Sequence, residues 1–229
     1  MKFSLYGALL GLATIISTAA ADYDRLNWND TAVLFIDHQT GLLNLVRDFQ
    51  PDEYLNSIMG LAEATKYFNL PTVLTTSRED GPNGPLLPEL KALFPDSPYI
   101  ARPGQINAWD DPDFVEAVRK TGKKQLVISG IVTDVCVTFV SLSAKAAGYE
   151  VFVVTDASGT FNAPIRDAAW MRMAQGGVQL MNWFAFACEI ARDWRMDVNG
   201  LAAMFAKRMP SYAHVMDSFN GAQAAVGSA

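Results

Sequence analysis

Cysteine and histidine are scarce in this chain of 229 residues, which contains only two of each. The cysteines are Cys136 and Cys188, and the histidines are His38 and His214. Two cysteines cannot build the disulfide framework of a small secreted scaffold. So few soft ligands also argue against a structural zinc cluster, and we expect neither a metal ion nor another cofactor.

Charged residues are also few, at 18% of the sequence, and the formal net charge is −6. A chain of this charge is not expected to bind a polyanion such as nucleic acid. Hydrophobic residues, by contrast, make up 50% of the sequence, and no internal repeat or low-complexity tract interrupts them. This composition predicts one well-filled domain.

The first 21 residues differ from the rest of the chain. Met1-Lys2 precedes a short apolar run that closes on the small residues Ala19-Ala20-Ala21. A basic start, an apolar centre and an A-x-A end predict a secretory signal peptide cleaved after Ala21, and hence a secreted or periplasmic protein. The run is too short for a stable membrane span, although an N-terminal anchor or a first helix of the domain are alternatives. Residues 22–229 would then form a single domain with a C-terminal helical segment.

Strand-like and helix-like patterns alternate along the rest of the chain. Apolar runs predict strands at residues 31–37, 71–77, 99–102, 125–130, 150–156 and 178–183. Helical spacing predicts helices at 53–68, 87–93, 112–121, 163–175, 185–195 and, broken by Pro210, 198–219. Continuous apolar strands that alternate with helices are typical of an α/β fold with a parallel sheet covered on both faces.

The segment from Lys124 to Gly148 organises the candidate site. Its apolar strand passes through a short turn into a helical pattern, and Thr133 or Asp134 is the natural N-cap of that helix. Cys136 then lies in the first helical turn, where the helix dipole favours a thiolate over a thiol. The alternative is a buried cysteine with no chemical role, because free cysteine is among the most buried residue types.

Three polar or reactive residues follow three predicted strands. Asp37 ends the first strand, Arg102 ends a short third strand, and Cys136 follows the fourth. Carboxyl ends of parallel strands meet at one edge of the sheet, where ligands bind in open α/β folds. A carboxylate beside a thiol can take its proton, and a cation between them favours both anions. We therefore expect these three side chains to form one site.

Several long motifs resemble the isochorismatase-like cysteine hydrolases, and within them the YcaC-like subgroup. The resemblance extends over about residues 29–194. It is carried by AVLFIDHQTGLL, TSREDGPNGPLLPELK, YIARPGQINAWDDPDF, SGIVTDVCV, VFVVTDASGTFN and the WF-x-x-ACE-x-x-RDWR run. The resemblance implies a three-layer α-β-α sandwich around a six-stranded parallel sheet, which agrees with the alternation above.

The resemblance also implies roles for individual residues. The family triad of Asp, Lys and Cys corresponds to Asp37, Arg102 and Cys136. A non-proline cis peptide is implied between Ile131 and Val132, which would aim the amides of Val132 and Cys136 into one oxyanion hole.

The chain departs from the family pattern at two places. Arg102 stands where the family has lysine, and arginine keeps its proton, so it can act only electrostatically or by hydrogen bonding. Nicotinamidase relatives carry an Asp-x-His metal site after the second strand, where this chain reads Thr76-Ser77-Arg78-Glu79-Asp80 without a histidine. Nicotinamidase chemistry with a bound metal is therefore not expected.

These observations predict a hydrolase with a cysteine nucleophile, acting on the C–N bond of a small amide-like substrate. Residues that flank the triad are candidates for substrate binding, each with a purely structural role as the alternative: Gln39, Gln105, Asn107, Trp109 and Thr160. We expect His38 and Cys188 to be structural. A catalytically idle member of the same fold, which binds a small molecule or responds to oxidation, is the second hypothesis.

The last predictions concern the thiols and assembly. We expect both cysteines to be free, because a bridge would consume the nucleophile. The resemblance to YcaC-like proteins implies a homo-oligomer, with an octamer as one form. The apolar run from Leu201 to Ala206, together with Trp170, Met171 and Met173, favours an interface. The alternative is that the C-terminal helix folds back onto its own sheet. We expect that helix and the loop near Gly81 to meet a neighbouring copy.

Overall fold

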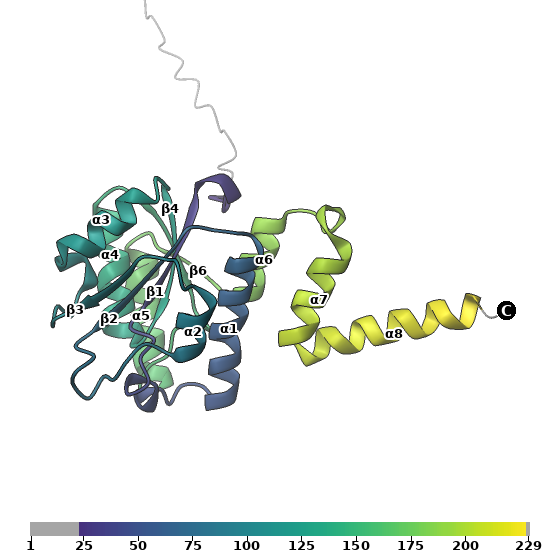
Figure 1. Ribbon diagram of the computed structural model, residues 1–229, viewed down its shortest axis with the longest axis horizontal. Helices are drawn as coiled ribbons and strands as arrows, with labels where there is room; N and C mark the ends of the chain where they lie inside the picture. The colour runs from purple at the N-terminus through teal and green to yellow at the C-terminus, as the bar shows by residue number, and fades with distance from the viewer. Residues whose placement is uncertain (1–22, 228–229) are drawn as a thin grey trace, which may run out of the picture.

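The computed structural model describes residues 23–227 and has one six-stranded parallel sheet with helices on both sides (Figure 1). The strand order is β3-β2-β1-β4-β5-β6, so the first and fourth strands of the chain lie side by side at the centre. The strands are β1 (Thr31–Ile36), β2 (Thr72–Ser77), β3 (Tyr99–Arg102), β4 (Gln125–Gly130), β5 (Glu150–Val154) and β6 (Gln179–Met181). The predicted three-layer α/β architecture is confirmed.

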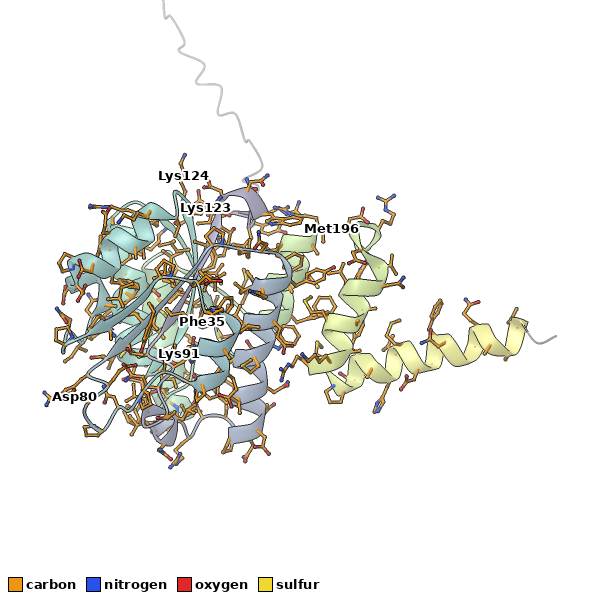
Figure 2. The ribbon with its side chains drawn as sticks, viewed as in Figure 1. Phe35, Asp80, Lys91, Lys123, Lys124 and Met196 are labelled. Carbon is orange, nitrogen blue, oxygen red and sulfur yellow. The ribbon has the colours of Figure 1, made fainter. Side chains whose placement is uncertain are left out.

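Alternation along each strand divides the core into two layers. In β1, Val33 and Phe35 face one apolar cluster, whereas Ala32, Leu34 and Ile36 face the other. The helices within residues 51–93 and 183–208 cover the first face, and those within residues 112–175 cover the second. Figure 2 shows Phe35 inside the body and Asp80, from the Pro/Gly-rich loop, at its outer margin. Because side chains on both faces of the sheet are buried, the strands appear in the sequence as continuous apolar runs.

Most helices begin and end close to the predicted positions, but the last one continues to Gly227, beyond the predicted end at residue 219. They are α1 (Pro51–Tyr67), α2 (Pro88–Leu93), α3 (Pro112–Lys120), α4 (Thr138–Ala146), α5 (Ala163–Gln175), α6 (Trp183–Ala191), α7 (Val198–Arg208) and α8 (Pro210–Gly227). The last strand and α6 are shorter than predicted. Asn182 caps α6 through the amide of Ala185, so the strand stops before it, and Arg192 ends the helix with a φ of 65°.

Helix α7 corrects part of the interface prediction. Leu201 and Phe205 are buried in the apolar cluster that also contains residues of α1. The apolar run from Leu201 to Ala206 therefore packs mainly against the core of its own chain. Met173 is likewise buried, whereas Met171 is exposed. Helix α8, in contrast, extends away from the body (Figure 1). The signal-peptide prediction falls on residues outside the described range. No helix between residues 23 and 227 is long and apolar enough to cross a membrane.

Candidate active site

The carboxyl edge of the sheet brings Asp37, Arg102 and Cys136 together. Asp37 directly follows β1, Arg102 is the last residue of β3, and Cys136 lies in a π-helical turn, η4 (Thr133–Val137), after β4. Strand β2 separates β1 from β3, and the Arg102 side chain crosses it to reach Asp37. The predicted convergence of the three residues is therefore a feature of the fold.

Arg102 and Asp37 form an ion pair whose side chains are both fully buried. The Nη2 group of Arg102 donates a hydrogen bond to Asp37 Oδ1. Its Nε group donates to Thr75 Oγ1 at 3.0 Å, and its Nη1 group donates to the carbonyl of Gln105. Contacts in three directions fix the plane of the guanidinium, a geometry that only arginine offers. The cost of burying such an ion pair is offset when its remaining N–H donors also form hydrogen bonds.

The turn after β1 sets the position of the carboxylate. Asp37 has a φ of 55°, in the left-handed region that residues other than glycine rarely adopt and that recurs at functional sites. Two residues later, the buried amide of Gln39 accepts from the Ser77 amide at 2.9 Å and donates to the Ser77 carbonyl at 3.0 Å. Gln39 was predicted to bind substrate, but its side-chain amide forms hydrogen bonds that hold this turn against β2.

The turn that carries Cys136 differs from the predicted helix start. Neither Thr133 nor Asp134 caps a helix, because the chain first makes the π-helical turn, and α4 begins only at Thr138. The peptide bond between Ile131 and Val132 is cis, as the family resemblance implied. The Val132 amide is directed at the sulfur of Cys136. The Val132 amide therefore lies beside the sulfur, and its role as an oxyanion-hole donor stays a prediction.

The prediction that Cys136 favours a thiolate is wrong for the resting site. Burial and the charge of Asp37 raise the pKa of the Cys136 thiol, while the Val132 amide and Arg102 oppose this more weakly. Burial also raises the pKa of Asp37, against the opposing effect of Arg102. The thiol interacts with the Asp37 carboxyl, yet within residues 23–227 Asp37 Oδ2 receives no hydrogen bond of ordinary geometry. This oxygen is a free acceptor for the thiol proton.

Tyr54 is a buried residue whose hydroxyl supports the turn before Cys136, a role that the sequence did not reveal. Its hydroxyl accepts the amide of Gly159 at 3.0 Å and lies 3.4 Å from the carbonyl of Gly130. The carbonyl of Gly159 in turn accepts the amide of Thr133 at 3.1 Å. Tyr54 therefore supports, through Gly159, both ends of the segment that contains Ile131 and Val132. Nothing in the helical pattern around Tyr54 distinguishes it from an ordinary core residue.

Thr160 supports the same turn from its other side. Its hydroxyl donates to Asp134 Oδ1 at 2.5 Å, and its amide donates to Asp48 Oδ1 at 2.8 Å. The residue is fully buried. These bonds tie the loop after β5 to the turn that holds Cys136, so Thr160 has a positioning role in the described chain.

The remaining candidates for substrate binding lie at different distances from the triad. Gln105 is next to it, because its carbonyl accepts from Arg102, and its side chain is half-buried. Asn107 donates to Ser143 Oγ at 3.0 Å and accepts the amide of Trp109. Trp109 packs edge-on against Phe114 and Tyr149, and its aromatic ring is partly buried against the second core layer.

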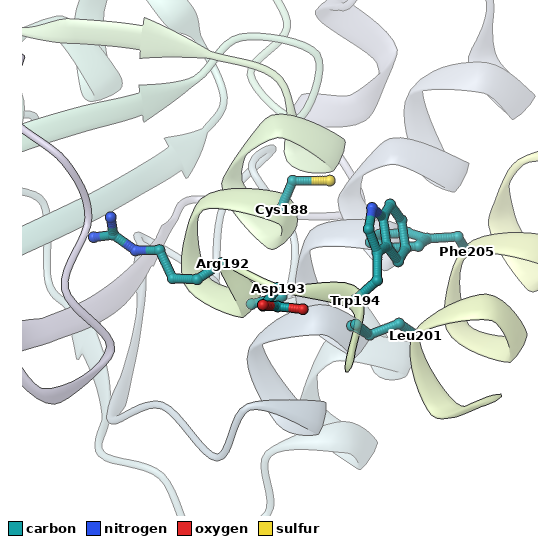
Figure 3. A pocket seen from close by; sticks show the side chains of 7 residues that line it. Cys188, Arg192, Asp193, Trp194, Leu201 and Phe205 are labelled. Carbon is teal, nitrogen blue, oxygen red and sulfur yellow. The ribbon is translucent and has the colours of Figure 1, made fainter. Parts of the chain in front are cut away.

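His38 and Cys188 have the structural surroundings that were predicted for them. Burial lowers the pKa of His38 to about 3, so the ring is neutral beside Ser129 Oγ at 3.0 Å. Cys188 lines a cavity of about 130 Å³ between α6 and α7, with Trp194, Leu201 and Phe205 (Figure 3). Both cysteines are free thiols, as predicted. Among residues 23–227, no group of three or more His, Cys, Asp or Glu residues is arranged to hold a metal ion.

Comparison with known proteins places these features in a family. The family described as Isochorismatase domain matches residues 31–184. "Probable hydrolase YcaC" of Escherichia coli (strain K12) is 62% identical over 198 residues, which cover 86% of this chain and 95% of that protein.

Two solved structures of YcaC proteins share the fold. YcaC from Pseudomonas aeruginosa, solved with hexane-2,5-diol and covalent acrylamide, is 63% identical with a TM-score of 0.86, and the match covers 87% of this chain and 98% of that chain. The E. coli YcaC structure, described as an octameric hydrolase of unknown specificity, has the same TM-score and coverage at 62% identity.

Proposed function

This chain belongs to the isochorismatase family, and within it to the YcaC-like hydrolases, and from that premise we propose that it hydrolyses a small amide-like substrate through Cys136. The observation that supports the proposal is the buried Asp37–Arg102 ion pair at the carboxyl edge of the sheet, with the Cys136 thiol close enough to interact electrostatically with the same carboxyl. A nucleophile, a base within reach and a group that orients the base are the parts that covalent catalysis needs.

The first step moves one proton and forms one bond. Asp37 Oδ2 takes the proton of the Cys136 thiol as the sulfur attacks the carbonyl carbon of the substrate. Arg102 holds Asp37 ionised and in place before the transfer, since without a cation a buried carboxylate would be protonated. Because the pKa of the thiol is raised, the proton leaves as the substrate binds and reacts. The resting enzyme therefore stores little thiolate.

The remaining steps return the enzyme to its starting state. The amides of Val132 and Cys136 stabilise the oxyanion of the tetrahedral intermediate. Collapse of this intermediate breaks the C–N bond, and the leaving amine takes the proton from Asp37. Water, deprotonated by Asp37, then attacks the thioester and releases the carboxylic acid and the Cys136 thiol. Gln105 is the candidate that lies nearest to the triad and is proposed to contact the substrate.

One property of a relative and one of this chain support this assignment. The P. aeruginosa YcaC structure contains covalent acrylamide, a small amide that reacts with nucleophiles. Arg102 does not remove the function of the family lysine, because it supplies the same positive charge to Asp37 with an additional bond to Thr75.

A turnover screen tests the proposal. Small amides, imides and hydroxamates are incubated with the wild type, with Cys136→Ala and with Cys188→Ala as a matched control. We expect release of amine by the wild type and by Cys188→Ala, and none by Cys136→Ala. Turnover that survives in Cys136→Ala would reject the nucleophile. Saturable binding without turnover by any variant would favour the catalytically idle, ligand-binding alternative.

We also propose that the protein is exported and forms a homo-oligomer. The basic and apolar pattern of residues 1–21 supports export, and a secreted or periplasmic product that begins at Asp22 is the expected result of N-terminal mass analysis. The octameric E. coli relative supports assembly, and α8 and the loop near Gly81 are the proposed contacts. Light scattering at micromolar concentration tests it, and a mass near that of one 25.0 kDa chain would reject it.

A further inference from the structure

Helix α8 leaves the body of the chain with most of its surface uncovered. Near its start, Tyr212 packs against Phe205 and Trp194, with ring centroids 5.5 and 6.2 Å apart. Beyond this point the helix extends away from the domain (Figures 1 and 2). Val215 and Phe219 are 59% and 56% exposed, although both are large apolar residues. An exposed apolar surface of this kind usually marks an interface.

The apolar side chains of α8 lie along one face of the helix. At 100° per residue, seven positions lie within about 60° of Phe219, and all but Gln223 are apolar or aromatic. We call the six others the α8 stripe: Tyr212, Val215, Met216, Phe219, Ala222 and Val226. His214 and Asp217 lie on the opposite face. The helix contains no lysine or arginine, so it lacks the basic residues with which interfacial helices hold an anionic membrane. The stripe therefore fits an apolar protein surface better than a lipid surface.

A suitable apolar surface exists elsewhere on the same chain. Helices α1, α2 and α7 border a hollow of about 420 Å³, lined by Tyr67, Leu93, Ala203 and Met204 and by the lysines Lys66 and Lys207. Lys207 is already paired with Glu63 at 2.8 Å, so its charge is largely compensated. We call this hollow the α1–α7 groove.

We propose that the α8 stripe of one copy occupies the α1–α7 groove of a second copy. The inference rests on the homo-oligomer proposed above and assigns its contact surfaces. A stripe and a groove on the same chain can satisfy each other by exchange between two copies, which gives a closed, two-fold interface. The E. coli relative, an octamer, is matched over 98% of its length, so the elements of its assembly have counterparts in this chain.

Charge placed on the stripe tests the contact first. Phe219→Asp introduces a carboxylate at the centre of the stripe, and His214→Asp introduces the same group on the opposite face as a matched control. We expect Phe219→Asp to reduce the mass in light scattering to no more than about half that of the wild type, because the two-fold contact is lost. His214→Asp should keep the wild-type mass. Circular dichroism of both variants checks that the domain remains folded.

Mixed cross-linking then identifies the surfaces. Two single-cysteine variants, Phe219→Cys and Ala203→Cys, are made in a chain that carries Cys136→Ser and Cys188→Ser. After subunit exchange and mild oxidation, the mixture should give a product of two chains, and neither variant alone should. Asp217→Cys replaces Phe219→Cys as the control and should not cross-link.

Each other outcome rejects the inference in a distinct way. A wild type with the mass of one chain rejects the assembly itself, whereas hydrolysis would be unaffected. A wild-type assembly that Phe219→Asp leaves intact, or a mixture without cross-links, rejects the α8 stripe and the α1–α7 groove as partners but keeps the assembly. A single-chain mass together with Phe219-dependent binding to anionic vesicles would assign the stripe to a membrane surface instead.

Discussion

Replacing Arg102 with methionine tests how the buried ion pair supports the site. Methionine keeps much of the length of the side chain but removes the contacts to Asp37, Thr75 and the Gln105 carbonyl. Asp37 would then be a buried carboxylate without a cation. Breaking a buried pair from one side typically costs about 3 to 5 kcal/mol. Because Asp37 can be protonated instead, we expect Arg102→Met to lower the free energy of unfolding by about 3 kcal/mol at neutral pH.

Urea unfolding at two pH values measures this effect. Removing Arg102 raises the pKa of the Asp37 carboxyl further in the folded state, while its unfolded pKa is unchanged. When the pKa of a carboxyl is higher in the folded state than in the unfolded state, the protein is most stable below the unfolded-state pKa. Its stability then falls as the pH rises through the folded-state pKa. The penalty of Arg102→Met should therefore be larger at pH 8 than at pH 5. Arg78→Met is the matched control, because Arg78 forms only an exposed pair with Asp80 at 4.0 Å.

Two results would refute this reasoning. The first is a penalty below about 1 kcal/mol at both pH values, similar to that of the exposed control. The second concerns the double variant Asp37→Asn/Arg102→Met, which removes the unpaired charge as well. We expect it to regain part of the lost stability, and a double variant that is less stable than Arg102→Met would show that the cost arises from packing.

Two further predictions concern the buried residues Tyr54 and Asp156. Tyr54→Phe removes the hydroxyl that holds Gly159 and should lower the turnover rate ~10- to 100-fold, while alkylation of Cys136, which needs no oxyanion hole, stays within about twofold of wild type. Equal loss of both rates would contradict a positioning role. Burial raises the pKa of Asp156 to about 6, so the folded state loses stability as the pH rises from about 4 to 6. Asp156→Asn can still accept the Trp183 amide. Its free energy of unfolding, measured with urea, should exceed that of the wild type by about 1 to 2 kcal/mol at pH 7.5 and by less at pH 5. A difference that does not change with pH would contradict the raised pKa of Asp156.

The sequence predicted the sheet and the nearness of Asp37, Arg102 and Cys136 because both follow from short-range patterns. Strands β3 and β4 begin and end at the predicted residues, since continuous apolar runs bounded by Gly and Pro leave little freedom. Asp37, Arg102 and Cys136 lie at or just beyond the ends of strands, and parallel strands share their carboxyl edge. Topology therefore places the three residues at one edge, and the length of the Arg102 side chain completes the approach.

What the sequence could not supply depends on contacts between distant segments. The bond from Tyr54 to Gly159 joins residues that are 105 positions apart, and no local pattern encodes it. The raised pKa of Cys136 depends on burial, which outweighs the dipole at the start of the turn.

The pH dependence of Cys136 labelling by acrylamide shows whether Asp37 takes the thiol proton. If Asp37 takes the thiol proton during attack, the rate of adduct formation at Cys136 should rise as Asp37 ionises and then stay level through neutral pH. An ordinary thiol below its pKa, such as Cys188, gains about tenfold per pH unit over the same range. Peptide mapping by mass spectrometry follows both residues in one sample. We expect a level region for Cys136 in the wild type that is absent in Asp37→Asn. A Cys136 rate that climbs tenfold per unit in the wild type, or a level region that survives in Asp37→Asn, would contradict it.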